Sequence, residues 1–288
     1  MSGRKEVQEV REVNDVKEKL VGIAAFFDLD GTLLPLPSLE RRFFRMLRRR
    51  GEIPQKNYFL WLAEALRLLP RGIATMLNAN KMYLRGVRVF EESGAENFDE
   101  FSAHEEALER VAWHAKQGHV IAIVSGTLEP LAIAFAQALE GELASRGVDV
   151  EVRVRATRLE TVRGYWTGRV LGDAMFGTAK ACAARRLAEE LRIDLSQSFA
   201  YGDGVHDQWL LESVGNPFAV NPSRELLRIA KKRDWQVLGW NQEKLTERTS
   251  SQRSQSKRSE TGKLAGESLL PEHSRTLGKQ FRSVGSCT

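Results

Sequence analysis

Short apolar runs alternate with longer helical patterns between residues 21 and 240, and this alternation constrains the fold more than any other feature. Each run is bounded by Gly, Asp, Asn or Ser, as expected for a buried strand. The alternation predicts a parallel sheet with helices on both faces, which is a three-layer, Rossmann-like α/β core. The predicted strands are residues 21–27, 119–124, 148–156, 199–201 and 218–220, and the predicted helices are residues 105–116, 129–145, 178–190 and 224–231.

One long interval interrupts the alternation. Residues 35–102 contain no obvious strand, but they carry the helical patterns LERRFFRMLRRR, NYFLWLAEALRLL and IATMLNANKMYLRGV. A simple crossover between two strands needs far fewer residues. We therefore expect a helical cap over residues 35–102, inserted into an α/β core that comprises residues 21–34 and 103–240.

The two ends of the chain differ from this core. Residues 1–20 place valines near helical spacing, which predicts a short amphipathic helix. Residues 241–288 are rich in Ser, Thr, Gln, Arg and Lys, and we expect this tail to be disordered. The tail carries nine Lys and Arg against five Asp and Glu, so most of the net charge of +5 lies in it. The remainder is nearly neutral, and we expect no nucleic-acid partner.

The sequence also bears on location. No apolar run approaches the roughly 18 residues that a membrane-spanning helix needs. The first residues alternate charges with valine and lack the continuous apolar region of a secretory signal. We therefore expect a cytoplasmic protein with no transmembrane segment.

Polar residues follow several of the predicted strands at their carboxyl ends, where ligands bind in open parallel sheets. Asp28 and Asp30 come directly after the first strand, and side chains two residues apart in a strand point the same way. Ser125, in VSGT, ends the second strand, and Asp203 and Asp207, in YGDGVHD, follow the fourth. The topology predicts that these side chains meet at one edge of the sheet.

The chemistry of this set is that of phosphoryl groups and magnesium. Mg²⁺ prefers oxygen ligands, usually one or two carboxylates together with waters and substrate phosphate oxygens. Aspartate can act as a covalent nucleophile toward phosphorus. Lys180, near the start of a predicted helix, and a serine hydroxyl could stabilise the charge on a transferring phosphoryl group.

Each signal has a simpler explanation when taken alone. An EF-hand loop beginning at Asp28 would need glycine at its sixth position and glutamate at its twelfth, where this chain has Leu33 and Leu39. Ser125 would more often be a helix cap, since SGTLE is similar to a capping sequence. An isolated Lys180 would usually be a solvated lysine. Their joint occurrence favours a site.

The segments FFDLDGTLL, VSGT, Lys180 and YGDGVHD, in this order, resemble the four motifs of the haloacid dehalogenase superfamily, in particular its phosphoserine-phosphatase-like hydrolases of subfamily IB. The resemblance implies that Asp28 is the nucleophile and Asp30 the general acid and base. It also implies that the Asp28 and Asp203 carboxylates and the Asp30 main-chain carbonyl bind Mg²⁺, with Asp207 supporting them.

The same resemblance assigns the phosphate ligands and the activity. Ser125, the Gly126 amide and Lys180 would bind the phosphoryl oxygens. The expected function is magnesium-dependent hydrolysis of a small phosphorylated metabolite, a phosphomonoester, through an aspartyl-phosphate. A non-catalytic phosphate-binding module and a phosphotransferase with an acceptor other than water stay open as alternatives.

One position departs from the family pattern and bears on the substrate. Phosphoserine phosphatases have a glutamate nine residues after the nucleophile that helps to hold the substrate amine, whereas this chain has Pro37 there and its nearest glutamate is Glu40. The departure argues against phosphoserine. Arg85, near the end of the predicted cap, is the residue that we expect to contact the substrate.

Overall fold

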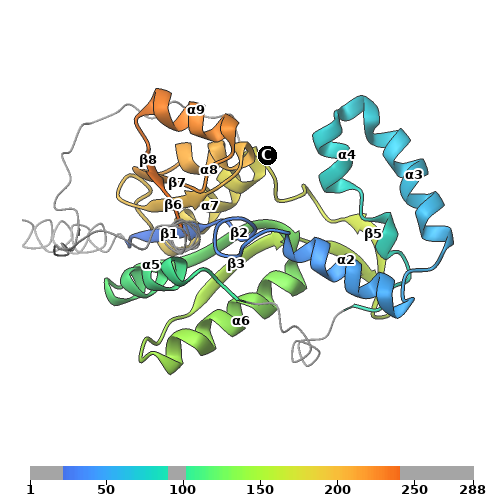
Figure 1. Cartoon of the computed structure of the whole chain (residues 1–288), viewed down its shortest axis with the longest axis horizontal. Helices are drawn as coiled ribbons and strands as arrows, with labels where there is room; N and C mark the ends of the chain where they lie inside the picture. Colours follow the sequence, from blue (N-terminus) through green and yellow to red (C-terminus); the bar gives the residue numbers. More distant parts are fainter. Residues whose placement is uncertain (1–21, 90–101, 241–288) are drawn as a thin grey trace, which may run out of the picture. The chain divides into compact units, whose positions relative to one another are not determined.

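The computed structural model describes residues 22–89 and 102–240, and it contains a six-stranded parallel sheet (Figure 1). The spatial order of the strands is β3-β2-β1-β6-β7-β8. The strands are β1 (Ala24–Phe27), β2 (Val120–Leu128), β3 (Val152–Thr157), β6 (Phe199–Gly202), β7 (Asn216–Val220) and β8 (Gln236–Leu238). The α/β prediction is confirmed, although the sequence did not indicate the short edge strand β8.

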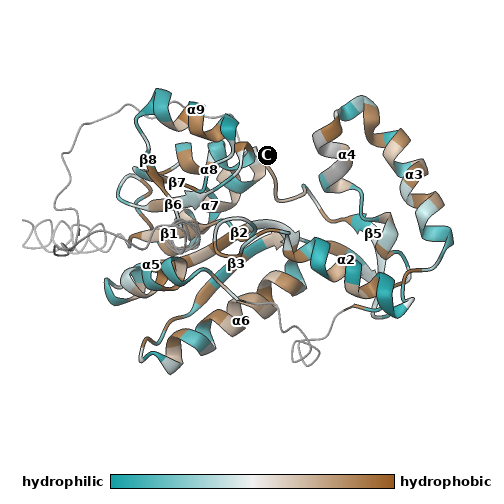
Figure 2. Ribbon diagram, viewed as in Figure 1, coloured by the Kyte–Doolittle hydropathy of each residue, from teal (hydrophilic) through white to brown (hydrophobic). Residues whose placement is uncertain are grey.

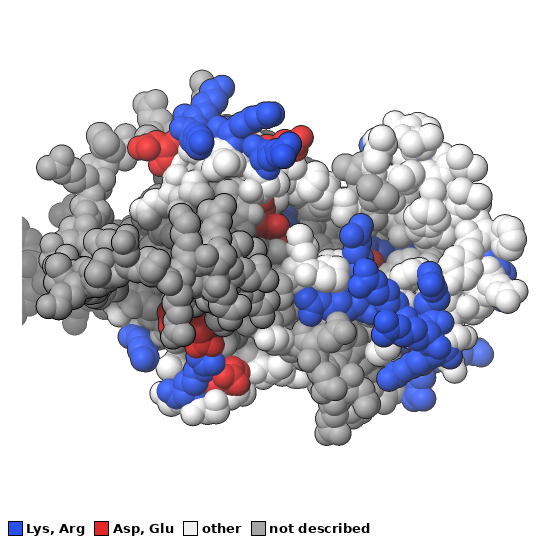
Figure 3. Space-filling view, in the orientation of Figure 1, with Lys and Arg blue, Asp and Glu red and all other residues white. Residues whose placement is uncertain are grey.

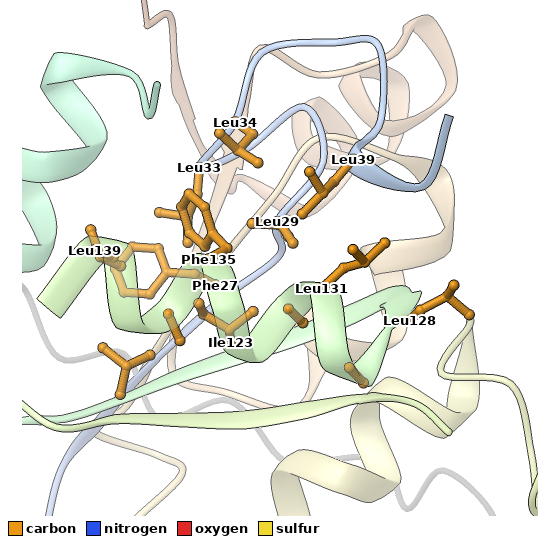
Figure 4. Packing of buried hydrophobic residues seen from close by; sticks show 14 of the residues in the cluster. Phe27, Leu29, Leu33, Leu34, Leu39, Ile123, Leu128, Leu131, Phe135 and Leu139 are labelled. Carbon is orange, nitrogen blue, oxygen red and sulfur yellow. The ribbon is translucent and has the colours of Figure 1, made fainter. Parts of the chain in front are cut away.

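Helices cover both faces of the sheet, as predicted. One face carries α5 (Glu105–Lys116) and α6 (Glu129–Ser145), and the other carries α7 (Thr178–Leu191), α8 (Gln208–Glu212) and α9 (Arg224–Arg233). Strand β1, with the sequence AAFF, is completely buried and supplies alternate residues to the two faces. Phe27 and Ile123 pack against Leu131 and Phe135 of α6 (Figure 4).

The described residues between β1 and α5 are largely helical, in agreement with the sequence patterns. It contains α2 (Leu39–Arg50), α3 (Lys56–Leu68), α4 (Ile73–Ala79) and the short 3-10 helices η1 (Leu69–Arg71) and η2 (Met82–Leu84). Hydrophilic residues dominate α2, whereas α6 in the core is largely hydrophobic (Figure 2). We call residues 35–89 the inserted segment. Its status as a separate cap domain stays a prediction.

A β-hairpin that the sequence did not indicate connects the sheet to this segment. Strands β4 (Leu159–Val162) and β5 (Tyr165–Val170) pair antiparallel. The main chain of Trp166 accepts a hydrogen bond from Gly86 (2.7 Å) and donates one to Val87 (3.0 Å). Gly168 has φ +83°, and a Cβ atom there would lie 3.0 Å from the Cα of Met82. The hairpin therefore contacts the end of the inserted segment closely.

Two further predictions can be compared with the structure. Ser125 does not end its strand, because β2 continues to Leu128 beside β3, and Leu128 rather than Ser125 is the N-cap of α6. The predicted helix at residues 1–20 and the predicted disordered tail at 241–288 lie outside the described residues. Among the described helices, none has both the length and the apolar character needed to span a membrane.

Candidate active site

The carboxyl ends of β1, β2 and β6 are neighbours, because β1 lies between β2 and β6 in the sheet. The main-chain N–H of Asp28, directly after β1, donates to the carbonyl of Tyr201 in β6 (2.9 Å). The strand order reverses at this point, because β2 and β3 are added on one side of β1 and β6, β7 and β8 on the other. Open α/β sheets bind their ligands at such a point. Asp28 and Asp203 thus belong to adjacent loops although they are far apart in sequence.

Three of the predicted carboxylates converge there. Asp28, Asp203 and Asp207 each offer an oxygen, and these oxygens lie within 4.8 Å of one another. The ammonium group of Lys180, in the first turn of α7, lies 2.6 Å from Asp28 Oδ1 and 2.5 Å from Asp207 Oδ1. The side chains of Asp28, Asp207 and Lys180 are almost fully buried. The structure therefore brings together four residues that the sequence selected.

Burial and crowding change the acidity of these groups. Burial raises the pKa of Asp28 well above its usual range, and Asp207 and Asp203 raise it further, while Lys180 lowers it. Burial, followed by the neighbouring Asp207, raises the pKa of Asp203 to about 7. Burial alone would lower the pKa of Lys180, but Asp207 and Asp28 raise it overall. Three negative charges held this close favour a cation.

Asp30 lies in the loop after β1, before the inserted segment, and is held through both carboxylate oxygens. Its Oδ1 accepts from the main-chain N–H of Leu39 (2.6 Å), the first residue of α2, and its Oδ2 accepts from the Thr127 hydroxyl (2.5 Å). Burial raises the pKa of Asp30, while these two hydrogen bonds lower it. Thr127 was not among the predicted residues, although its position two residues after Ser125, in the same strand, was an available signal.

The remaining predicted ligands come from β2. Ser125 is buried, and its Oγ accepts from the Thr127 N–H (3.2 Å). The carbonyl of Gly126 accepts from the Thr157 hydroxyl in β3 (2.8 Å). Through Thr127, this part of β2 is connected to Asp30, and the contact of Ser125 and Gly126 with a phosphoryl group stays a prediction.

Arg85 lies apart from this arrangement. It is exposed at the end of η2, and its main-chain carbonyl accepts from the Asn57 side chain (2.7 Å). Among the contacts of the described residues, none joins Arg85 to the carboxylates. Its contact with substrate stays a prediction.

A second charged cluster, which was not predicted from the sequence, adjoins Asp30. Glu40, the second residue of α2, accepts from Lys81 Nζ at 2.6 and 2.7 Å and from the Tyr83 hydroxyl at 2.7 Å. Lys81 is only 4% exposed, so its charge is balanced inside the protein by Glu40. The negative charge of Glu40 also raises the pKa of Asp30. The nearest glutamate to Pro37 is therefore already paired.

The donor set fits a magnesium ion. Asp28, Asp203 and Asp207 offer only oxygen, the ligand type that Mg²⁺ prefers. With Lys180 protonated, the three carboxylates and the ammonium leave two negative charges, which one divalent cation would balance. A bound cation would also lower the raised pKa values of Asp28 and Asp203.

Comparison with known proteins shows the family to which the chain belongs. A family model described as haloacid dehalogenase-like hydrolase matches residues 25–212. Phosphoserine phosphatase SerB1 of Mycobacterium tuberculosis is 30% identical over 225 residues, which cover 74% of this chain and 70% of that protein.

Solved structures share the fold. A protein of unknown function from Bordetella pertussis superposes with a TM-score of 0.60 at 28% identity, covering 76% of this chain and 98% of that one. A substrate-bound phosphoserine phosphatase complex superposes with a TM-score of 0.50 at 21% identity, covering 75% of this chain and 92% of that one. The family match and the similarity to SerB1 confirm the resemblance, and the chain belongs to the haloacid dehalogenase-like hydrolases.

Proposed function

We propose that this haloacid dehalogenase-type phosphatase is magnesium-dependent and hydrolyses a small organic phosphomonoester through a phosphorylated Asp28. The observation that carries the proposal is the convergence of Asp28, Asp203, Asp207 and Lys180 at the carboxyl edge of the sheet. A nucleophile, a cation site and a fixed positive charge are what phosphoryl transfer requires.

In the first step, an oxygen of Asp28 attacks phosphorus and forms a new O–P bond while the bond to the substrate oxygen breaks. Asp30 gives its proton to the departing oxygen. The burial that raises the pKa of Asp30 favours the protonated form needed for this step. In the second step, Asp30 takes a proton from water as that water attacks phosphorus, which releases inorganic phosphate and restores Asp28.

The other residues hold the phosphoryl group and the nucleophile in place. Lys180 contacts Asp28 in the structure, so it is well placed to reach an oxygen of a group transferred to Asp28. Asp207 orients Lys180 through Oδ1 and accepts from the Gly204 N–H through Oδ2 (2.9 Å). Ser125 and the Gly126 amide would bind the remaining phosphoryl oxygens. Magnesium, held by Asp28 and Asp203 with the Asp30 carbonyl, would neutralise charge on the transferring group.

The substrate differs from phosphoserine in this proposal, although the relative SerB1 is named for that activity. Pro37 cannot receive an ammonium group through its side chain. Glu40 could, but Lys81 and Tyr83 already use its carboxylate. We therefore expect a phosphomonoester without an amine at the corresponding position, with Arg85 as a candidate contact. A cytoplasmic location stays a prediction.

Replacement of the nucleophile tests the proposal. Purified Asp28→Asn should hydrolyse p-nitrophenyl phosphate with magnesium at least about 1,000-fold more slowly than the parent, because the amide is a poor nucleophile. The matched control is Asp149→Asn, which changes an exposed aspartate and should leave the rate unchanged. Full activity of Asp28→Asn would refute the nucleophile assignment.

Two further measurements separate the alternatives. Chelation of divalent metal should abolish activity and added Mg²⁺ should restore it. A panel of phosphorylated metabolites should give its best kcat/KM on a compound other than phosphoserine. Absence of hydrolysis on the whole panel with magnesium present would favour a binding module, and phosphate appearing on an added alcohol would favour a phosphotransferase.

A further inference from the structure

We propose that the inserted segment docks on the surface of an anionic phospholipid membrane through an apolar stripe on α3 and the arginines of α2. The stripe consists of Phe59, Leu62 and Leu66, with Leu69 following at the end of the helix. Spacings of three and four place these side chains on one side of the helix. Phe59 is 76% exposed and Leu66 is 65% exposed. Contiguous exposed apolar side chains of this kind mark an interaction surface.

The fold itself does not need this stripe. Helix α3 already has an apolar inner side, on which Ala65 and Leu68 are buried and Trp61 packs against the main core. Asn57, on the same inner side, donates to the main-chain carbonyls of Tyr83 (3.0 Å) and Arg85 (2.7 Å). A helix that is apolar on both sides is normally buried on both sides. The outer side of α3 therefore has the character of a surface that a binding partner covers.

The neighbouring helix α2 supplies the charge. Leu39, Phe43 and Leu47 form its buried side. Its exposed positions are mostly arginines, namely Arg41, Arg45, Arg48, Arg49 and Arg50. Figure 3 shows basic side chains gathered over α2, beside a largely uncharged surface over α3 and α4. Residues 35–89 contain twelve Lys and Arg against three Glu and no Asp. This segment is therefore strongly basic, although residues 1–240 taken together are nearly neutral.

Both helices are attached to the same short stretch of chain. Glu40 of α2 binds Lys81 and Tyr83, the ring of Phe44 in α2 packs edge-on against Tyr83, and Asn57 of α3 binds the carbonyl of Tyr83. The stripe and the arginines are therefore parts of one packed unit, and a single partner can contact both.

The chemistry of the two parts selects the partner. Nucleic acid would bind the arginines but leave the apolar stripe in water. A second copy of this chain would bring two strongly basic segments together, at a cost in repulsion. An anionic bilayer offers lipid phosphates to the arginines and an apolar interior to Phe59, Leu62 and Leu66, the combination used by peripheral helices that lie in the membrane interface.

Vesicle sedimentation with the full chain tests the proposal. The protein should pellet with vesicles of equal parts phosphatidylglycerol and phosphatidylcholine, and at least about tenfold less with phosphatidylcholine alone. One variant carries Phe59→Ser, Leu62→Ser and Leu66→Ser, and a second carries Arg45→Gln, Arg48→Gln and Arg49→Gln. Each should weaken binding to the anionic vesicles by about tenfold or more while hydrolysis of a soluble aryl phosphate is retained.

Matched controls remove the same groups elsewhere. Arg228→Gln with Lys231→Gln and Lys232→Gln deletes three exposed charges from α9, and Val162→Ser with Leu171→Ser deletes two exposed apolar side chains, one from the end of β4 and one from the residue after β5. Both should bind vesicles like the parent. Equal losses in controls and test variants would overturn the proposal. So would absence of pelleting, or a stripe variant that changes the oligomeric state in gel filtration while vesicle binding is unchanged.

Discussion

Glycine at position 31 allows the loop after β1 to approach the loop after β6. Its φ is +92°, a conformation that L side chains rarely adopt, and a Cβ atom there would lie 2.2 Å from Asp203 Oδ2. Any side chain at position 31 would therefore displace Asp203 from the carboxylate cluster. The glycine of the DGT motif is needed for contact between two loops as well as for the turn itself.

Gly31→Ala should impair both folding and function. We expect a loss of about 1–2 kcal/mol in the free energy of unfolding from the positive φ, and a fall of at least about 100-fold in kcat/KM because Asp203 is displaced. Gly147→Ala is the matched control, since Gly147 has φ +77° with nothing within 4 Å of the added Cβ. Urea unfolding and steady-state kinetics measure the two effects. If Gly147→Ala lost activity equally, the displacement argument would fail.

Thr127 is a positioning residue for Asp30. Thr127→Val keeps the side-chain volume but removes the hydroxyl that donates to Asp30 Oδ2. We expect kcat to fall about tenfold with a smaller change in KM. Because that hydrogen bond lowers the pKa of Asp30, its loss should raise this pKa and move the Asp30-dependent limb of the pH–rate profile to higher pH. Thr127→Ser should restore the parent profile, and an unmoved limb in Thr127→Val would contradict this role.

At the scale of elements, α5 is joined to the centre of the sheet through a buried histidine. His114 Nε2 lies 2.8 Å from the Tyr201 hydroxyl in β6, and its Nδ1 lies 2.8 Å from His119 Nδ1. Tyr201 in turn stacks on Phe27 of β1, with ring centroids 4.6 Å apart. Burial, followed by His119 and Arg110, lowers the pKa of His114 to about 3. The histidine is therefore neutral in the folded protein near neutral pH.

This contact makes stability depend on pH. Unfolded His114 titrates near its ordinary pKa of 6.5, so between that pH and about 3 the unfolded chain binds one more proton than the folded chain. Stability should accordingly fall as the pH drops through this window, by up to about 1.4 kcal/mol per pH unit from this group. His114→Gln should show a shallower slope in urea unfolding at several pH values. An equal slope in the two proteins would exclude His114 as the cause.

The elements also show what sequence alone can specify. Helices α5 and α6 begin and end at the predicted residues, because both have marked ends: Pro130 stands in the first turn of α6, and Gly118 and Gly147 follow the two helices. The β4–β5 hairpin was missed because its turn residues, Arg163 and Gly164, have φ of 51° and 79°, and arginine is an unusual first residue for such a turn. Strand β8 was missed because it is a short, partly exposed edge strand.

Part of the site could also be predicted from the sequence and part could not. The proximity of Asp28, Asp203 and Asp207 was predictable, because parallel strands end at a common edge of the sheet. Lys180 could be selected only by its position near the start of a predicted helix, since nothing local distinguishes it from a solvated lysine. The Glu40, Lys81 and Tyr83 cluster could not be predicted, because it depends on how α2 and η2 pack. Distances between elements of an irregular insertion are not encoded in any short pattern.

At the scale of the whole molecule, the carboxylate cluster opposes folding until a cation balances it. Mg²⁺ binds the folded chain in preference to the unfolded one, so it should raise Tm by roughly 5–10 °C at a hundredfold excess over its dissociation constant. Asp203→Asn should remove most of this shift, whereas Asp149→Asn should keep it. Differential scanning fluorimetry with and without MgCl₂ measures it. A full shift in Asp203→Asn would remove Asp203 from the ligand set.

The main-chain pairing of Gly86 and Val87 with Trp166 has a consequence for modularity. The hairpin at residues 159–170 belongs to the α/β core in sequence, yet the main chain of its Trp166 pairs with the inserted segment. A chimera that replaced residues 35–89 alone would remove Gly86 and Val87, whose main chain pairs with the N–H and carbonyl of Trp166. It would also replace Met82, whose Cα lies close to Gly168. Transplanting specificity between relatives therefore requires that residues 35–89 and 159–170 be exchanged together, although residues 90–158 separate them in sequence.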